Sequence, residues 1–201
     1  MIDERFIGVL GPDGAGKSTL IKGLTNYLES KKQKVHYFHW RIPWFKSDDT
    51  KVSICTDPHA KPPYGMFLSV IKLIYLLFIA WPAWLKNAWP HLCRKEWVIL
   101  DRGPDDLCCD PRRYRYGGPI WLAQFWARLM PRPEKIIVVT ADPESIATRK
   151  LEVSKEELAR QIMQYKNLSS KKYLHVCSSS LPEDTLENAL KLLFEDHTDF
   201  T

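Results

Sequence analysis

The ten residues from Gly11 to Leu20, GPDGAGKSTL, contain the pattern G-x-x-x-x-G-K-[ST] of a phosphate-binding loop. Glycines let such a loop curl until successive backbone N–H groups point at phosphate oxygens. The lysine of the pattern reaches the β- and γ-phosphates, and the serine hydroxyl can bind Mg²⁺. We therefore expect a nucleoside triphosphate to be bound by Gly11, Asp13, Gly14, Ala15, Gly16, Lys17, Ser18 and Thr19.

A second chemical group follows the apolar run WVIL, where Asp101 closes a predicted buried strand. An acidic residue in this place is the usual partner of a phosphate-binding loop, and it holds Mg²⁺ directly or through water. We expect Ser18 and Asp101 to hold the metal. The alternative is a plain aspartate at the end of a strand, without a metal.

Five apolar runs, separated by helical patterns, must position these groups. They are RFIGVLG (5–11), KVHYFHW (34–40), EWVILD (96–101), KIIVVTA (135–141) and YLHVCSS (173–179). The alternation predicts an α/β fold with three layers, in which helices flank a five-stranded parallel sheet. Ligands in such folds bind at the carboxyl ends of the strands. The glycine loop, Arg41, Asp101 and Thr140 all follow or end strands, which places them along one rim.

The loop, the pair Asp101–Arg102 and the run DPRRYRYGGP (110–119) together resemble the thymidylate-kinase-like P-loop nucleoside monophosphate kinases, in a divergent branch. The resemblance covers nearly the whole chain. It implies a single P-loop kinase domain over residues 1–201, with a lid at about 143–170 and with ATP and Mg²⁺ as cofactors.

The same resemblance implies roles for individual residues. Asp13 would lie near the reacting phosphates, and Arg102 and Arg41 would hold the phosphate of the acceptor. The alternative for Arg41 is a surface arginine in a long loop. Arg149 would act from the lid, together with Lys150 and Arg160, although a solvated charged helix is the alternative for this region. The expected catalytic residues are Lys17, Asp13, Arg102, Asp101 and Arg149.

The run DPRRYRYGGP carries three arginines, Arg112, Arg113 and Arg115. They could hold a phosphate or stack on a base. They could equally form a structural turn, held by ion pairs with neighbouring aspartates. We favour the functional interpretation and expect Arg113 to join Arg41 and Arg102 at the acceptor. The two glycines of the run predict a bend that side chains would obstruct.

These residues imply ATP- and Mg-dependent phosphoryl transfer to a phosphorylated small molecule, a nucleoside monophosphate such as thymidylate. The predicted helix before the third strand has few polar groups that could read a base. Two alternatives therefore stay open. One is a kinase for a sugar- or lipid-linked phosphate, and the other is a non-enzymatic, nucleotide-dependent switch.

Composition limits the partners and the compartment. The 201 residues carry a formal net charge of +5 without a long block of one sign, so we expect no nucleic acid polymer as a partner. The five cysteines have no framework spacing, which predicts free thiols and a cytoplasmic location. A homodimer is expected from the resemblance alone.

The apolar segment Met66–Leu85 is long enough to suggest a transmembrane helix. Lys72 lies inside it, and Pro82 interrupts it. We expect a helix that is buried on most sides and broken near Pro82. Two less favoured alternatives stay open, namely contact with a membrane surface and, behind it, a true membrane span.

Overall fold

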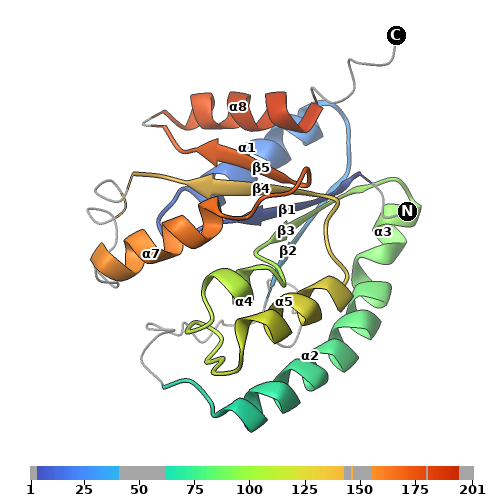
Figure 1. Ribbon diagram of the computed structural model, residues 1–201. Coiled ribbons are helices and arrows are strands. Elements are labelled where there is room, and N and C mark those ends of the chain that lie inside the picture. Colours follow the sequence, from blue (N-terminus) through green and yellow to red (C-terminus); the bar gives the residue numbers. More distant parts are fainter. Residues whose placement is uncertain (1–3, 41–61, 143–145, 147–154, 180, 195–201) are drawn as a thin grey trace.

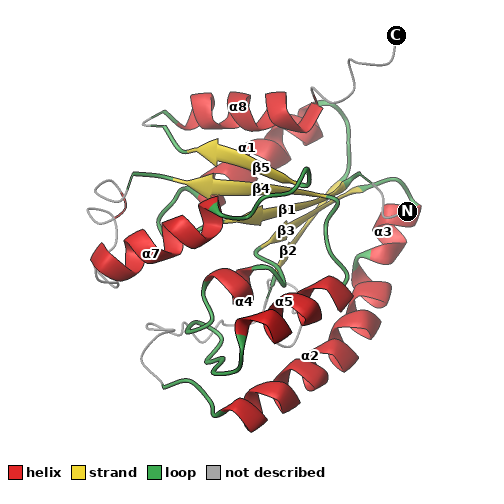
Figure 2. Cartoon of the chain, in the orientation of Figure 1, coloured by secondary structure: helices red, strands yellow, loops and turns green. Residues whose placement is uncertain are grey.

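The computed structural model describes residues 4–40, 62–142, 146, 155–179 and 181–194. Its five strands form one sheet in the order β2-β3-β1-β4-β5, and all pairs are parallel (Figures 1 and 2). The strands are β1 (Phe6–Leu10), β2 (Val35–His39), β3 (Trp97–Asp101), β4 (Lys135–Thr140) and β5 (Tyr173–Cys177). Each lies within an apolar run predicted to be a strand.

Helices cover both faces of the sheet, as Figure 1 shows. One face carries α1 (Lys17–Ser30) and α8 (Pro182–Phe194). The other carries α2 (Met66–Asn87), α3 (Trp89–Cys93), α4 (Asp106–Cys109) and α5 (Ile120–Leu129). A further helix, α7 (Lys155–Lys166), packs beside β4 and α4. The predicted three-layer α/β fold is therefore confirmed.

The strands place alternate side chains on the two faces of the sheet, as strand geometry requires. In β1, Ile7 and Val9 join the core under α1 and α8, whereas Phe6 packs under α2 and α5. All five residues of β1 are buried. A strand buried on both faces reads as a continuous apolar run, which is why this strand was predictable.

Helix α2 corrects one prediction, because it is not buried on most sides. Its inner face, with Leu73, Leu76 and Trp84, belongs to the core. Its outer face is open, and Phe67 and Phe78 are 76% and 74% exposed. The error arose because composition does not distinguish an apolar helix that is covered all round from one that is covered on one side only.

The course of α2 also differs from the prediction. It runs through Pro82 without a break, and the chain turns at Ala88 before α3 begins. By length and composition the segment Met66–Cys93 could cross a membrane. In this fold, however, its inner face is occupied, and the Trp126 indole of α5 donates to the Leu73 carbonyl at 2.7 Å.

The signature segment 110–119 is fastened to the start of α2. The Gly117 N–H donates to Ser69 Oγ at 3.0 Å, and Lys72 donates to the carbonyl of Tyr114. A Cβ at Gly117 would lie 2.1 Å from the Tyr64 carbonyl oxygen, so a side chain would clash with backbone. This close approach explains the bend that the glycines predicted.

The four described cysteines, Cys93, Cys108, Cys109 and Cys177, are free thiols, as expected. Burial raises the pKa of Cys108 to about 12, so this thiol stays protonated at neutral pH. Cys55 lies outside the described residues.

Candidate phosphate-binding site

The glycine loop joins the end of β1 to the start of α1, the context that its pattern requires. Gly11, Gly14 and Gly16 have φ angles of +145°, +83° and +94°, a region that other residues rarely adopt. A Cβ at Gly11 would also lie 2.1 Å from the Val139 carbonyl oxygen. Because α1 begins at Lys17, its unpaired N–H groups and partial positive charge face the loop.

Lys17 is turned into this loop. Its side chain is buried, donates to the Pro12 carbonyl at 2.7 Å and lies 3.8 Å from Asp13 Oδ1. Burial, followed by repulsion from Arg102, lowers the pKa of Lys17 to about 8. A phosphate in the loop would offer the ammonium group a stronger partner than a carbonyl oxygen.

The Asp13 carboxylate is the centre of the site. One oxygen accepts a hydrogen bond from Arg102 Nη2, and the other accepts one from Arg113 Nη1 at 2.7 Å. Burial raises the pKa of Asp13, but the charges of Arg102, Arg113 and Lys17 outweigh it and hold that pKa well below its usual range. Two guanidinium groups from different segments therefore meet at one anion beside the phosphate loop.

Arg102 has an unusual backbone conformation. Its φ is +69°, which costs a non-glycine residue about 1–2 kcal/mol. Its N–H donates to the Val9 carbonyl at 2.9 Å, which fixes the start of the segment to β1. The guanidinium is buried and also donates to Asp106 Oδ2 at 2.8 Å. The chain thus holds one arginine between two carboxylates.

Asp106 was not among the predicted site residues, yet it joins three segments. It is fully buried and accepts hydrogen bonds from Arg102, from the Tyr114 hydroxyl at 2.9 Å and from the Tyr165 hydroxyl of α7. Burial raises the pKa of Asp106, but the charge of Arg102, the hydrogen bond from Tyr165 and the charge of Arg113 together hold that pKa below its usual range, so the group is ionised. The i, i+4 spacing from Arg102 could have suggested this ion pair, but no local signal pointed to Tyr165.

Asp101 occupies the end of β3, as predicted. Its Oδ2 atom accepts from the Tyr37 hydroxyl at 3.0 Å and from His39 Nδ1 at 2.9 Å. Burial raises the pKa of Asp101, and the hydrogen bond from His39 contributes most to the net lowering. Its Oδ1 atom is buried and has no hydrogen-bond partner among the described residues. A buried carboxylate oxygen with a free lone pair fits a metal ion or a metal-bound water.

A small pocket adjoins the loop at the start of α1. Ser18 and Thr19 are exposed at the start of α1, and Thr19 contributes to the pocket. The remaining lining comes from the loop, from the segment after β5 and from the start of α8. The lining residues are Gly16, Thr19, Leu20, Ser178, Ser179, Pro182 and Thr185.

The remaining predicted residues are either outside the described part of the chain or paired elsewhere. Arg41, Arg149 and Lys150 lie outside the described residues. Arg160 of α7 pairs with Glu157 on the same helix, at 2.9 and 2.6 Å. Within the signature segment, Arg115 donates to the Pro62 carbonyl and stacks on Tyr64, which supports the structural interpretation for this arginine. Among the contacts of the described residues, that of Arg113 with Asp13 links this segment to the site.

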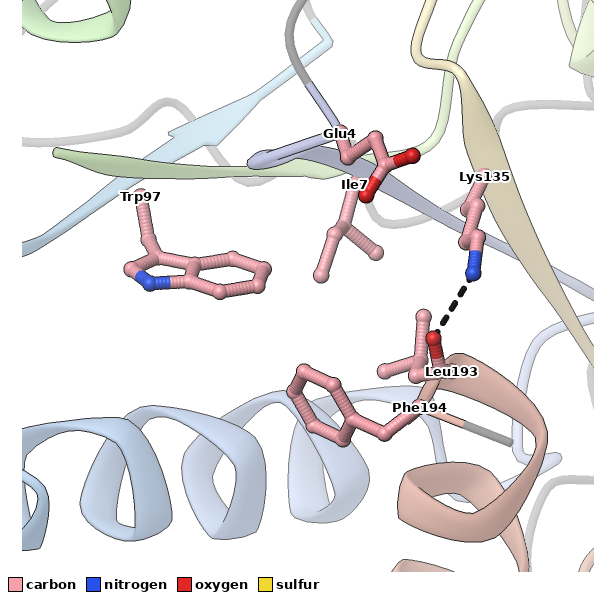
Figure 3. A pocket seen from close by; sticks show the side chains of 6 residues that line it. All are labelled: Glu4, Ile7, Trp97, Lys135, Leu193 and Phe194. Atoms are coloured by element: carbon pink, nitrogen blue, oxygen red, sulfur yellow. Dashed lines mark hydrogen bonds between the residues drawn. The ribbon is translucent and has the colours of Figure 1, made fainter. Parts of the chain in front are cut away.

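A second pocket lies at the opposite, amino-terminal end of the strands (Figure 3). In this pocket the ammonium group of Lys135 donates to the Leu193 carbonyl at 2.7 Å and so caps the end of α8. The ring of Phe194 meets that of Trp97 edge to face. These contacts are structural, and this pocket is not a candidate for phosphate chemistry.

The fold is similar to a solved thymidylate kinase from Ehrlichia chaffeensis, with a TM-score of 0.61 and 17% sequence identity. The match covers 94% of this chain and 97% of that one. No protein-family model matches the sequence, and no curated protein matches it either. The likeness establishes a thymidylate-kinase-like, P-loop kinase fold. The assignment to a divergent branch stays a prediction.

Replacing Asp106 by asparagine is expected to destabilise the protein by about 3–5 kcal/mol, because Arg102 would keep its charge in a buried place with one carboxylate fewer. The melting temperature should fall by roughly 10 °C. Thermal unfolding followed by circular dichroism measures this. Glu187→Gln, the same chemical change on the exposed side of α8, is the control and should leave the melting temperature unchanged. A D106N protein that melts within 2 °C of the parent would contradict the account.

Nucleotide binding is expected to weaken as the pH rises above about 8, where the unliganded Lys17 loses its proton. A bound triphosphate favours the charged form of Lys17, and burial lowers the pKa of this group when no phosphate is bound. Nucleotide affinity is therefore full below pH 8 and falls by up to tenfold per pH unit above about pH 8. Titration with a fluorescent ATP analogue between pH 7.5 and 9.5 tests this. The Lys17→Met variant should bind the ATP analogue weakly, and its affinity should not change with pH over this range. A parent protein with constant affinity across this range would overturn the assignment.

Proposed function

We propose that the protein is a P-loop kinase that transfers a phosphoryl group from ATP to a phosphate already carried by a small acceptor, a nucleoside monophosphate such as thymidylate. One observation carries the proposal: Arg102 and Arg113 converge on the Asp13 carboxylate directly beside Lys17. Each guanidinium offers a planar fork of donors that suits a phosphate monoester. An acceptor phosphate would take over these donors from Asp13.

Phosphoryl transfer asks a protein mainly to position two substrates and to neutralise charge. Lys17 would hold the donor's terminal phosphates, and Arg102 and Arg113 would hold the acceptor. Because the pKa of Asp13 is held low, this carboxylate is a weak base. That is no obstacle, since a phosphate acceptor has no proton that a strong base must remove at neutral pH.

The donor side would contain Mg²⁺ held by Ser18 and Asp101, for which the free Oδ1 atom of Asp101 is the support. When bound, the ion would neutralise charge on the β- and γ-phosphates. We further propose that residues 1–201 form one kinase domain, that the segment about 143–170 closes over the donor, and that Arg149 and Arg41 act as the resemblance implies. A cytoplasmic location and the lack of a nucleic acid partner stay predictions.

The identity of the acceptor is less constrained than its phosphate. The inward polar groups of α2 are engaged elsewhere, because Ser69 binds Gly117 and Lys72 binds Tyr114. Neither is free to read a base in this arrangement. A set of candidate acceptors for an activity assay must therefore include sugar phosphates and a lipid-linked phosphate besides nucleoside monophosphates.

The proposal is tested by measuring ADP release with Mg-ATP across that set of acceptors. An acceptor should stimulate turnover, Lys17→Ala should abolish it, and Arg113→Ala should raise the acceptor KM at least tenfold with little change in the KM for ATP. Arg115→Ala, whose guanidinium contacts Pro62 and Tyr64 instead, is the matched control. Slow hydrolysis without stimulation by any acceptor would favour the nucleotide-dependent switch.

We also propose that the outer face of α2 and α5 is covered by a second copy of the chain. Thirteen large apolar side chains on these helices are at least 41% exposed, and Trp81 of α2 donates to the Leu129 carbonyl of α5, which joins the two helices. At about 150–250 Å² for a large side chain, the exposed area is on the order of 1,000 Å². That exceeds the usual apolar patch of a monomer and matches what one partner buries in a stable dimer.

Analytical ultracentrifugation tests this proposal. The parent should sediment as a dimer, and the double variant Phe78→Glu/Trp121→Glu should sediment as a folded monomer. Glu187→Gln is the control. A monomeric parent, or one that associates only with phospholipid vesicles, would contradict the dimer.

A further inference from the structure

Three metal-ligating side chains meet at a place that phosphoryl transfer does not use. His36 Nε2 of β2 and His91 Nδ1 of α3 lie 2.9 and 2.8 Å from the same oxygen, Oε2 of Glu96. The ligand atoms of the three residues all lie within 4.8 Å of one another. The two imidazole rings are stacked, with centroids 3.5 Å apart.

This cluster lies away from the phosphate loop. Glu96 precedes β3, and His36 pairs with Val98 near the beginning of that strand, whereas the loop follows the carboxyl end of β1. Helix α3 lies at the end of the sheet opposite the strand arrowheads (Figure 1). The cluster is therefore independent of the candidate active site.

We propose that His36, His91 and Glu96 form a Zn²⁺ site with three protein ligands and one open position. Two imidazole nitrogens and a carboxylate oxygen are a common zinc ligand set. Tetrahedral zinc, with bonds of about 2.0–2.2 Å, separates its ligand atoms by about 3.3 Å. The present N···O separations need to widen by about half an ångström to reach that value. The two stacked rings must also tilt so that both in-plane lone pairs point at the ion.

The protonation states of the cluster suit this ligand set. Hydrogen bonds from His91 and His36 help to lower the pKa of Glu96 to about 2, so it is a carboxylate. Each ring would turn its lone pair to the ion by moving its proton to the other ring nitrogen. Two cations compete for Glu96, namely Arg94 and Lys34, each 3.6 Å away. Their side chains are 59% and 78% exposed, so both can move into solvent when an ion binds.

The ligands come from β2, from α3 and from the residue before β3, so a bound ion would have a structural role. An ion here would tie α3 to the β2–β3 edge of the sheet. Because α3 continues from α2, the same ion would hold the carboxyl-terminal end of α2 against the fold. The site is thus expected to be structural, and turnover of ATP does not depend on it.

The test is a titration of the metal-free, full-length protein with Zn²⁺, read by calorimetry and by thermal unfolding. One equivalent should bind, and a 100-fold excess of free Zn²⁺ over Kd should raise the melting temperature by about 5 °C or more. Co²⁺ in place of Zn²⁺ should give the intense visible bands of a tetrahedral centre. An excess of Mg²⁺ should not displace the bound Zn²⁺, because Mg²⁺ does not favour imidazole ligands.

Variants locate the ion. His91→Ala and Glu96→Gln should each weaken Zn²⁺ binding by about 100-fold or more and remove the thermal shift. His175→Ala and Cys93→Ser change an exposed histidine outside the cluster and a neighbouring thiol. Both variants should retain Zn²⁺ binding and the thermal shift. Since unfolding could itself abolish binding, each variant is first shown to melt cooperatively without metal. No binding by the parent, or binding that survives in the H91A and E96Q proteins, would overturn the proposal.

Discussion

The arrangement of the candidate site depends on one electrostatic interaction, that of the Asp13 carboxylate with the cations around it. Three cations, those of Lys17, Arg102 and Arg113, are crowded beside a loop that is itself rich in N–H donors. Without an anion at their centre they would repel one another. The Asp13 carboxylate provides that anion. Under the proposed function, the phosphate of the acceptor would take its place.

That interaction extends into the fold through Asp106. This carboxylate accepts a hydrogen bond from Arg102, which fixes the guanidinium. It also links the signature segment to α7, because the Tyr114 and Tyr165 hydroxyls both donate to it. The left-handed backbone of Arg102 is consistent with this arrangement, since surrounding contacts must maintain a conformation that costs free energy. The same buried carboxylate, that of Asp106, thus positions Arg102 and attaches α7 to the fold.

Residue spacing and apolar runs in the sequence predicted the features that depend only on residues close together in the chain. The phosphate loop, the five strands and the strand-end aspartate Asp101 all follow from spacing and apolar runs. Contacts between distant segments did not follow: Tyr165 reaches Asp106 across 59 positions, and His39 reaches Asp101 across 62. The exposure of α2 escaped prediction for a related reason, because which side of an apolar helix is covered depends on neighbours that composition does not specify.

The most direct measurement is a crystal structure of the protein with a non-hydrolysable ATP analogue and an acceptor that stimulates turnover. We predict that the guanidinium groups of Arg102 and Arg113 leave Asp13 and donate to the acceptor's monoester, with Lys17 on the donor's terminal phosphates. An acceptor phosphate bound elsewhere, with both arginines still paired to Asp13, would contradict it.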